Sequence, residues 1–146
     1  MLFFVTLSVL LACVNANFYT DCGSKQAKVL SVNVSGCAED AKECVLKRNT
    51  NATFSIDFTP SKAEPAVHII VHGVVMNLPI PFPIPQPDAC KEAGLTCPLQ
   101  PGQPVKFTTS MPVLKSYPKV KVDVKWELRD DNEEDLVCVL ISARIQ

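Results

Sequence analysis

Apolar and polar residues alternate strictly over residues 119–128. Side chains along a β-strand point alternately to opposite faces, so this period of two predicts a strand with one buried and one solvent-facing side. The polar side carries only lysine, aspartate and glutamate. The apolar side is formed by Val120, Val122, Val124, Trp126 and Leu128.

The same alternation recurs elsewhere and predicts a chain made mostly of strands. Residues 30–34 and 54–58 alternate, a short run surrounds Phe107, and an acidic turn leads into a return strand at residues 136–145. Residues 67–76 are more continuously apolar, which predicts a strand buried on both faces. Helical periodicity is absent from the sequence. Short strands separated by Pro- and Gly-rich turns predict one all-β domain, an antiparallel sandwich.

The first sixteen residues form an apolar run that ends in Val14-Asn15-Ala16. Small residues at the end of a short apolar run are typical of a signal peptide, and the run is too short to span a bilayer as a helix. No Lys or Arg precedes the run, and an uncleaved anchor is the alternative. We expect residues 1–16 to be removed and residues 17–146 to form a secreted, soluble domain.

The chain has a formal net charge of −1 and no block of like charges, which disfavours nucleic acid as a partner. Cys13 leaves with the predicted signal peptide. An even set in an oxidising compartment predicts three disulfides, whereas zinc sites favour close C-x₂-C pairs in a reducing one. The set is Cys22, Cys37, Cys44, Cys90, Cys97 and Cys138.

The spacing of the six cysteines narrows the possible disulfide pairings but does not decide among them. Cys37 with Cys44, and Cys90 with Cys97, would each close a short polar loop and leave one cysteine near each end of the domain. Six cysteines allow 15 pairings, and these stay open at this point. Two sequons, at Asn33 and Asn51, are predicted to be glycosylated in a secreted chain, with unused sequons as the alternative.

Catalysis is not expected. The two histidines, His68 and His72, are four residues apart in a predicted strand, about 13 Å, so they cannot share a metal ion. Neither a nucleophile elbow nor a phosphate loop nor a pair of carboxylates in apolar surroundings is present. We therefore predict a binding protein with no catalytic residue, metal or cofactor.

Prolines occupy every second position from Pro79 to Pro87. They remove alternate backbone donors, so the segment must lie at a sheet edge or in a loop. Proline-rich ligands of signalling domains are usually flanked by basic residues, and this segment is not. An apolar lip at the mouth of a pocket fits better. Its side chains on one side would be Leu78, Ile80, Phe82 and Ile84.

The order of several motifs resembles the sterol-carrying branch of the ML (lipid-recognition) domain family. The motifs are Asp21-Cys22-Gly23-Ser24, Val32-Asn33-Val34-Ser35-Gly36-Cys37, His72-Gly73, the proline-alternating segment, Asp88-Ala89-Cys90, Cys97-Pro98-Leu99, Pro112-Val113, Tyr117-Pro118 and Trp126. The resemblance implies an immunoglobulin-like sandwich of two sheets that part slightly to admit a sterol. It also implies the disulfides Cys22–Cys138, Cys37–Cys44 and Cys90–Cys97.

The resemblance also assigns roles to single residues. Phe82 and Tyr117 would flank the entrance of the pocket. The lipid-binding lining would be Val34, Leu46, Phe82, Val113, Tyr117, Pro118, Val122, Val124, Trp126 and Ile141. A rim facing membranes or a receptor would be His72, Gly73, Val74, Val75, Met76 and Ile80.

Two positions depart from the vertebrate members of this branch. Val139 stands where they have a tryptophan at the pocket, and Asn77 stands where they have a glycine at the rim. A reshaped pocket makes a carrier of fatty acids or semiochemicals one alternative to sterol transport. Innate-immune recognition of microbial lipids, which the wider family also implies, is another. The implied partners are a lipid, transiently a membrane surface, and a lysosomal membrane sterol transporter of the Niemann-Pick type C1 kind. The protein is expected to be a monomer that is secreted or lies in the lysosomal lumen.

Overall fold

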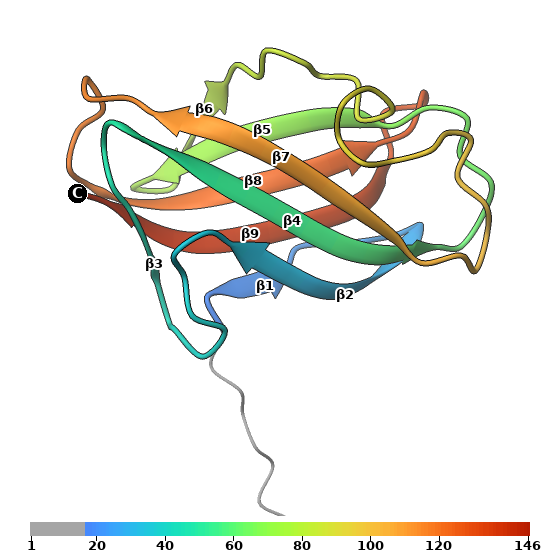
Figure 1. Ribbon diagram of the computed structural model, residues 1–146, viewed down its shortest axis with the longest axis horizontal. Coiled ribbons are helices and arrows are strands. Elements are labelled where there is room, and N and C mark those ends of the chain that lie inside the picture. Colours follow the sequence, from blue (N-terminus) through green and yellow to red (C-terminus); the bar gives the residue numbers. More distant parts are fainter. Residues whose placement is uncertain (1–16) are drawn as a thin grey trace, which may run out of the picture.

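Two β-sheets packed face to face form the computed structural model, which describes residues 17–146 (Figure 1). The predicted signal peptide, residues 1–16, lies outside the described residues. The larger sheet has the order β1 (Tyr19–Asp21), β9 (Asp135–Ile145), β8 (Lys121–Arg129), β5 (His68–Val75) and β6 (Leu78–Phe82), and β3 (Cys44–Leu46) pairs with β9. The smaller sheet has the order β2 (Ala27–Val34), β4 (Thr50–Pro60) and β7 (Val105–Val113). Between Phe18 and the C-terminus the chain contains no helix that could cross a membrane.

The predicted all-β sandwich is confirmed. The pairs within the two sheets are antiparallel, apart from the short parallel pair of β3 with β9. The strictly alternating stretch forms β8, which lies between β5 and β9 (Figure 1). Its apolar side faces the smaller sheet. Trp126 from this strand is fully buried, with ring centroids 4.9 Å from Phe54 on β4 and 6.0 Å from Phe107 on β7.

Two strands differ from the simple alternation. A bulge between Val29 and Ser31 shifts the register of β2 against β4, so Leu30 turns outward and is half exposed. On β5, Ile69 and Val71 are buried, but Ile70 on the other face is only half buried. The prediction that this strand is buried on both faces was wrong, because no further layer of the described chain packs on the outer face of the larger sheet.

Three disulfides join the pairs that the family resemblance implied. They are Cys22–Cys138, Cys37–Cys44 and Cys90–Cys97. The first closes a separation of 116 residues, which stabilises the fold by about 5 kcal/mol in the chain-entropy model.

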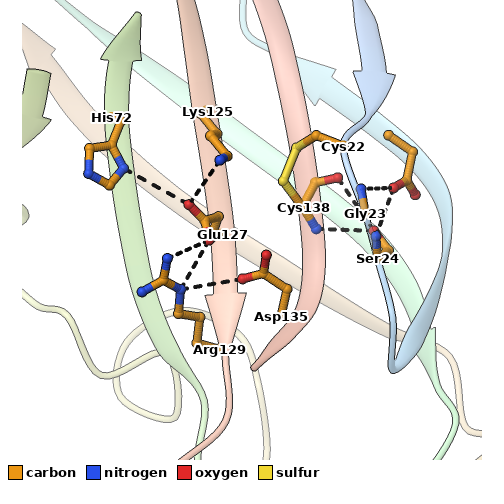
Figure 2. The surroundings of a disulfide bond; sticks show 10 residues. Cys22, Gly23, Ser24, His72, Lys125, Glu127, Arg129, Asp135 and Cys138 are labelled. Atoms are coloured by element: carbon orange, nitrogen blue, oxygen red, sulfur yellow. Dashed lines mark hydrogen bonds and ion pairs between the residues drawn. A yellow bond between two sulfur atoms is a disulfide. The ribbon is translucent and has the colours of Figure 1, made fainter. Parts of the chain in front are cut away.

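The Asp-Cys-Gly-Ser motif builds a turn around this disulfide (Figure 2). The Asp21 carboxylate accepts hydrogen bonds from the backbone N–H groups of Gly23 and Ser24, both at 2.9 Å. Gly23 has φ of 126°, a conformation that side chains rarely allow. The Ser24 hydroxyl accepts the N–H of Cys138 at 3.0 Å, so the motif fixes the N-terminal segment to β9.

Candidate functional site

An apolar cavity of about 70 Å³ lies between the two sheets. The larger sheet contributes residues from β5, β6, β8 and β9, and the smaller sheet contributes residues from β4 and β7. The end of β3 and the loop between β7 and β8 complete the wall. The lining is Leu46, Ala52, Phe54, Val71, Gly73, Phe82, Met111, Pro112, Val113, Tyr117, Val122, Val124 and Ile145.

The cavity exists partly because of a glycine. Inward positions of β5 carry Ile69 and Val71, and the next inward position is Gly73, which pairs with Val124 on one side and Ile80 on the other. A Cβ placed on Gly73 would lie 3.4 Å from Cγ2 of Val122, at ordinary contact distance. Because Gly73 has no side chain, it leaves a space that a side chain like those of Ile69 and Val71 would fill.

Phe82 and Tyr117 face each other in the wall of the cavity. Their ring centroids lie 5.6 Å apart and their planes meet at 71°, an edge-to-face contact. Phe82 ends the edge strand β6, whereas Tyr117 belongs to the loop between β7 and β8. Burial raises the pKa of Tyr117, so its hydroxyl stays neutral at physiological pH. This hydroxyl is the one hydrogen-bonding side-chain group in a lining that is otherwise hydrocarbon and a thioether.

The proline-alternating segment lies at a sheet edge, as its composition predicts. β6 pairs with β5 alone, and Pro79 and Pro81 fall on the face opposite the cavity. Leu78 and Ile80 point to the same side as Phe82 but remain 67% and 53% exposed. The segment thus places one aromatic side chain in the cavity wall and two aliphatic ones beside it.

The turn between β5 and β6 carries the most exposed apolar side chain among these residues. Met76 is 89% exposed, and both Met76 and Asn77 have positive φ, 50° and 64°. A two-residue hairpin turn needs this conformation, and asparagine tolerates it. The replacement of glycine by Asn77 therefore leaves the turn intact. We call Met76, Leu78 and Ile80 the apolar rim.

Six of the ten residues expected to bind lipid meet in the cavity wall: Leu46, Phe82, Val113, Tyr117, Val122 and Val124. Three others, Val34, Trp126 and Ile141, are buried in the core outside the lining, and Pro118 is exposed beside Tyr117. The lining residues Ala52, Phe54, Val71, Met111, Pro112 and Ile145 were not among those ten. Alternation marks these side chains as interior at best, and it carries no signal for which of them face a void.

The residues expected at the rim separate into four groups. Met76 and Ile80 are exposed, whereas Gly73 faces the cavity. Val75 is partly buried against the core. His72 and Val74 lie on the outer face of the larger sheet, in register with Lys125 and Asp123.

The outer face of the larger sheet carries a cluster of charges around Glu127 (Figure 2). Glu127 is only 3% exposed, although its place in the alternating strand predicts a solvated side chain. Its carboxylate lies 2.7 Å from Arg129, 3.6 Å from Lys125 and 4.0 Å from His72. Arg129 also reaches Asp135 at 3.3 Å. These neighbours cover the carboxylate, and compensating charge makes its burial tolerable.

Two carboxyl groups in this cluster have opposite pKa shifts. Burial, followed by the hydrogen bond and charge of Glu127, raises the pKa of Asp135 to about 6. Burial opposes ionisation of Glu127, but hydrogen bonds from Asp135 and Arg129 outweigh it and lower the pKa of Glu127. The pair therefore holds one proton more readily than two separate carboxyls would.

The remaining candidate positions lie apart from the cavity. Asn33 on β2 and Asn51 on β4 have exposed side chains. His68 bonds to Asp131 at 2.8 Å and shares no partner with His72. Among residues 17–146, no group of three or more His, Cys, Asp or Glu side chains could hold a metal ion.

Comparison with known proteins gives a consistent assignment. Residues 16–145 match the family profile described as ML domain. The ecdysteroid-regulated 16 kDa protein of Manduca sexta is 62% identical over 99% of both chains. The NPC intracellular cholesterol transporter 2 homolog a of Drosophila melanogaster is 45% identical over 97% of this chain and 96% of its own. The crystal structure of a Niemann-Pick type C2 protein from Japanese carpenter ant superposes with a TM-score of 0.83, at 30% identity, covering 88% of this chain and 98% of that one.

Proposed function

The chain belongs to the ML-domain family, and on that premise we propose that it binds one sterol-like lipid in the cavity and carries it without chemical change. The observation that carries the proposal is the cavity itself, an apolar space between two sheets with one neutral hydroxyl in its wall. Burying apolar surface would supply the affinity, and the Tyr117 hydroxyl, the one polar side-chain group among the lining residues, would bond the single polar group of a sterol.

The expected affinity is sufficient for a carrier. At about 0.3 kcal/mol per heavy atom, a ligand of roughly 28 atoms gains about 8 kcal/mol, which corresponds to a micromolar dissociation constant or tighter. The ligand-free cavity of about 70 Å³ is much smaller than the space a sterol needs, since even benzene occupies a cavity of about 150 Å³. Binding therefore requires the sheets to part and the Phe82–Tyr117 contact to open.

Transfer would take place at the apolar rim. Met76, Leu78 and Ile80 expose hydrocarbon next to the cavity wall, and such a patch on a protein surface usually marks a docking site. We propose that the rim touches a membrane, or a membrane sterol transporter of the Niemann-Pick type C1 kind, while lipid moves in or out. His72, Gly73, Val74 and Val75 support the rim from β5.

An oxidising compartment fits this role. Three disulfides favour secretion or a lumenal location, and we propose that residues 1–16 act as the signal peptide. Glycosylation of Asn33 and Asn51 would occur on exposed strand positions, away from the cavity.

A titration with a fluorescent sterol tests the proposed ligand. Trp126 is the single tryptophan of the chain and packs on Phe54, a lining residue, so energy transfer from it to a bound sterol reports occupancy. We expect saturation at one sterol per chain, displacement by unlabelled cholesterol, and no displacement by equimolar fatty acid. If the fatty acid displaces the probe and cholesterol does not, the ligand is an acyl lipid and not a sterol. Saturation at several sterols per chain would point to surface adsorption.

Fatty acids, semiochemicals and microbial lipids remain the competing ligands. Val139, whose identity suggested a reshaped pocket, is fully buried opposite Trp126 and lies outside the lining. It therefore gives no particular support to a ligand other than a sterol.

A further inference from the structure

Arg48 ties together three segments that line the cavity. It lies in the turn between β3 and β4, and its Nη1 donates to the carbonyl oxygens of Lys115 at 3.1 Å and Tyr117 at 3.4 Å. Its backbone N–H donates to the carbonyl of Gln146 at 2.8 Å. A single residue at the end of β3 therefore holds both the end of β9 and the loop that carries Tyr117.

The loop has few other attachments. Within residues 115–118, the other hydrogen bond in the structure is the local turn bond from the N–H of Tyr117 to the carbonyl of Leu114, at 3.1 Å. Arg48 itself is absent from the cavity lining. The contact of its side chain with the cavity wall is thus indirect, through the backbone carbonyls of the loop.

We propose that Arg48 is the positioning residue of the entrance, holding the Tyr117 wall in place so that lipid passes only when the opposite wall, which carries Phe82, moves. This inference rests on the proposed carrier function. The two walls differ in how they are held, because β6 is an edge strand paired on one side only. Loss of the Arg48 bonds would free the second wall, and lipid would then enter and leave faster.

The chemistry of arginine suits this role. A guanidinium presents several donors in a fixed plane and keeps its charge at any physiological pH, so one side chain can bond two carbonyls of a loop. Lysine carries a shorter, non-planar donor group and would restore the contact only in part. In the sequence, Arg48 looks like an ordinary solvated cation in a polar turn, so no pattern marks it.

The test compares Arg48→Gln and Arg48→Lys with wild type. Arg144→Gln is the matched control, because Arg144 on β9 pairs with Glu43 at 3.0 Å and lies outside the cavity lining. Hydrogen exchange at the backbone amides of residues 115–117 is measured in the ligand-free protein. Loading rate, release rate and dissociation constant are then measured with the fluorescent sterol, and thermal unfolding checks that each variant is folded.

We expect the Tyr117 amide of Arg48→Gln to exchange about tenfold faster or more, the loss expected when bonds from a charged donor disappear. Loading and release should accelerate together, leaving the dissociation constant within about threefold of wild type, because removing the tie affects both directions of passage. Arg48→Lys should fall between wild type and Arg48→Gln, and Arg144→Gln should match wild type.

Two results would overturn the inference. The first is unchanged amide exchange in the loop of a folded Arg48 variant. The second is a release rate that rises with unchanged loading, because Arg48 would then stabilise the bound state and not the entrance. If wild type binds no sterol, the proposed function fails, whereas the exchange measurement on ligand-free protein still decides whether Arg48 holds the loop. If Arg48→Gln does not fold, Arg48→Lys provides the same comparison.

Discussion

Enlarging Gly73 should weaken lipid binding without unfolding the protein. Gly73 faces the cavity from β5, between Val124 and Ile80, and its lack of a side chain helps to leave the space open. Gly73→Ala adds one methyl group, and Gly73→Val adds three carbon atoms in the branched form that strands favour. Both substitutions fill the position where a ligand would lie.

The effect on stability follows from three contributions. Burying each added carbon stabilises the fold by about 0.8 kcal/mol, and replacing a glycine in a strand interior stabilises it by about 0.5–1 kcal/mol more. The new Cβ itself would meet Cγ2 of Val122 at 3.4 Å, an ordinary contact distance, so only the two further carbons of valine risk overpacking, which typically costs about 1–3 kcal/mol. Since the cavity of about 70 Å³ absorbs most of the added volume, we expect Gly73→Ala to be about 1 kcal/mol more stable than wild type and Gly73→Val to be at least as stable.

Sterol affinity should fall as the side chain at position 73 grows, whereas stability should not. Sterol titration should show weaker affinity for Gly73→Ala and at least a tenfold loss for Gly73→Val, and chemical unfolding of the ligand-free variants measures stability in parallel. Ser142→Val is the control, because Ser142 lies on the outer face of the same sheet, between the inward Ile141 and Ala143. Full sterol affinity in Gly73→Val would refute the assignment of the cavity, and so would a parallel loss of stability and binding.

Three further changes probe other parts of the account. Phe82→Ala should weaken sterol binding by about 2–4 kcal/mol through the lost apolar contact, and unchanged binding in a folded variant would remove Phe82 from the site. Met76→Asp should slow sterol exchange with anionic liposomes at acidic pH while equilibrium binding stays near wild type, and equal exchange rates would deny the rim a role in transfer. The pKa of Asp135 is raised from 3.8 to about 6, so its contribution to stability is complete below pH 3.8 and is lost as pH rises through about 6. Asp135→Asn keeps a donor for Glu127 at every pH. The unfolding free energy of this variant relative to wild type should therefore rise between pH 4 and 7, by at most about 3 kcal/mol. A difference that does not change with pH would contradict a proton shared by Asp135 and Glu127.

Much of the fold could be predicted from periodicity. The alternation at residues 119–128 placed β8 and its inward face correctly, because a period of two admits only one pleated arrangement. The proline spacing placed β6 at an edge, since prolines cannot supply the hydrogen bonds that a central strand needs. The bulge at Leu30 could not be foreseen, because it depends on how β2 pairs with a distant strand.

The candidate site was less accessible from the sequence. Phe54 and Val71 read as core, and only the separation of the two sheets decides that they border a space. Glu127 occupies an outward position, yet side chains from three strands bury it. Such effects depend on residues brought together from different parts of the chain, which alternation along one strand does not report.

The proposed function requires the cavity between the sheets to hold one lipid. Native mass spectrometry of the full mature protein, purified after incubation with a mixed lipid extract, measures this directly. We predict a single additional mass equal to one sterol per chain for wild type, and no additional mass for Gly73→Val. A wild-type protein that retains no lipid, or a Gly73→Val variant that retains the same lipid at the same stoichiometry, would contradict the claim.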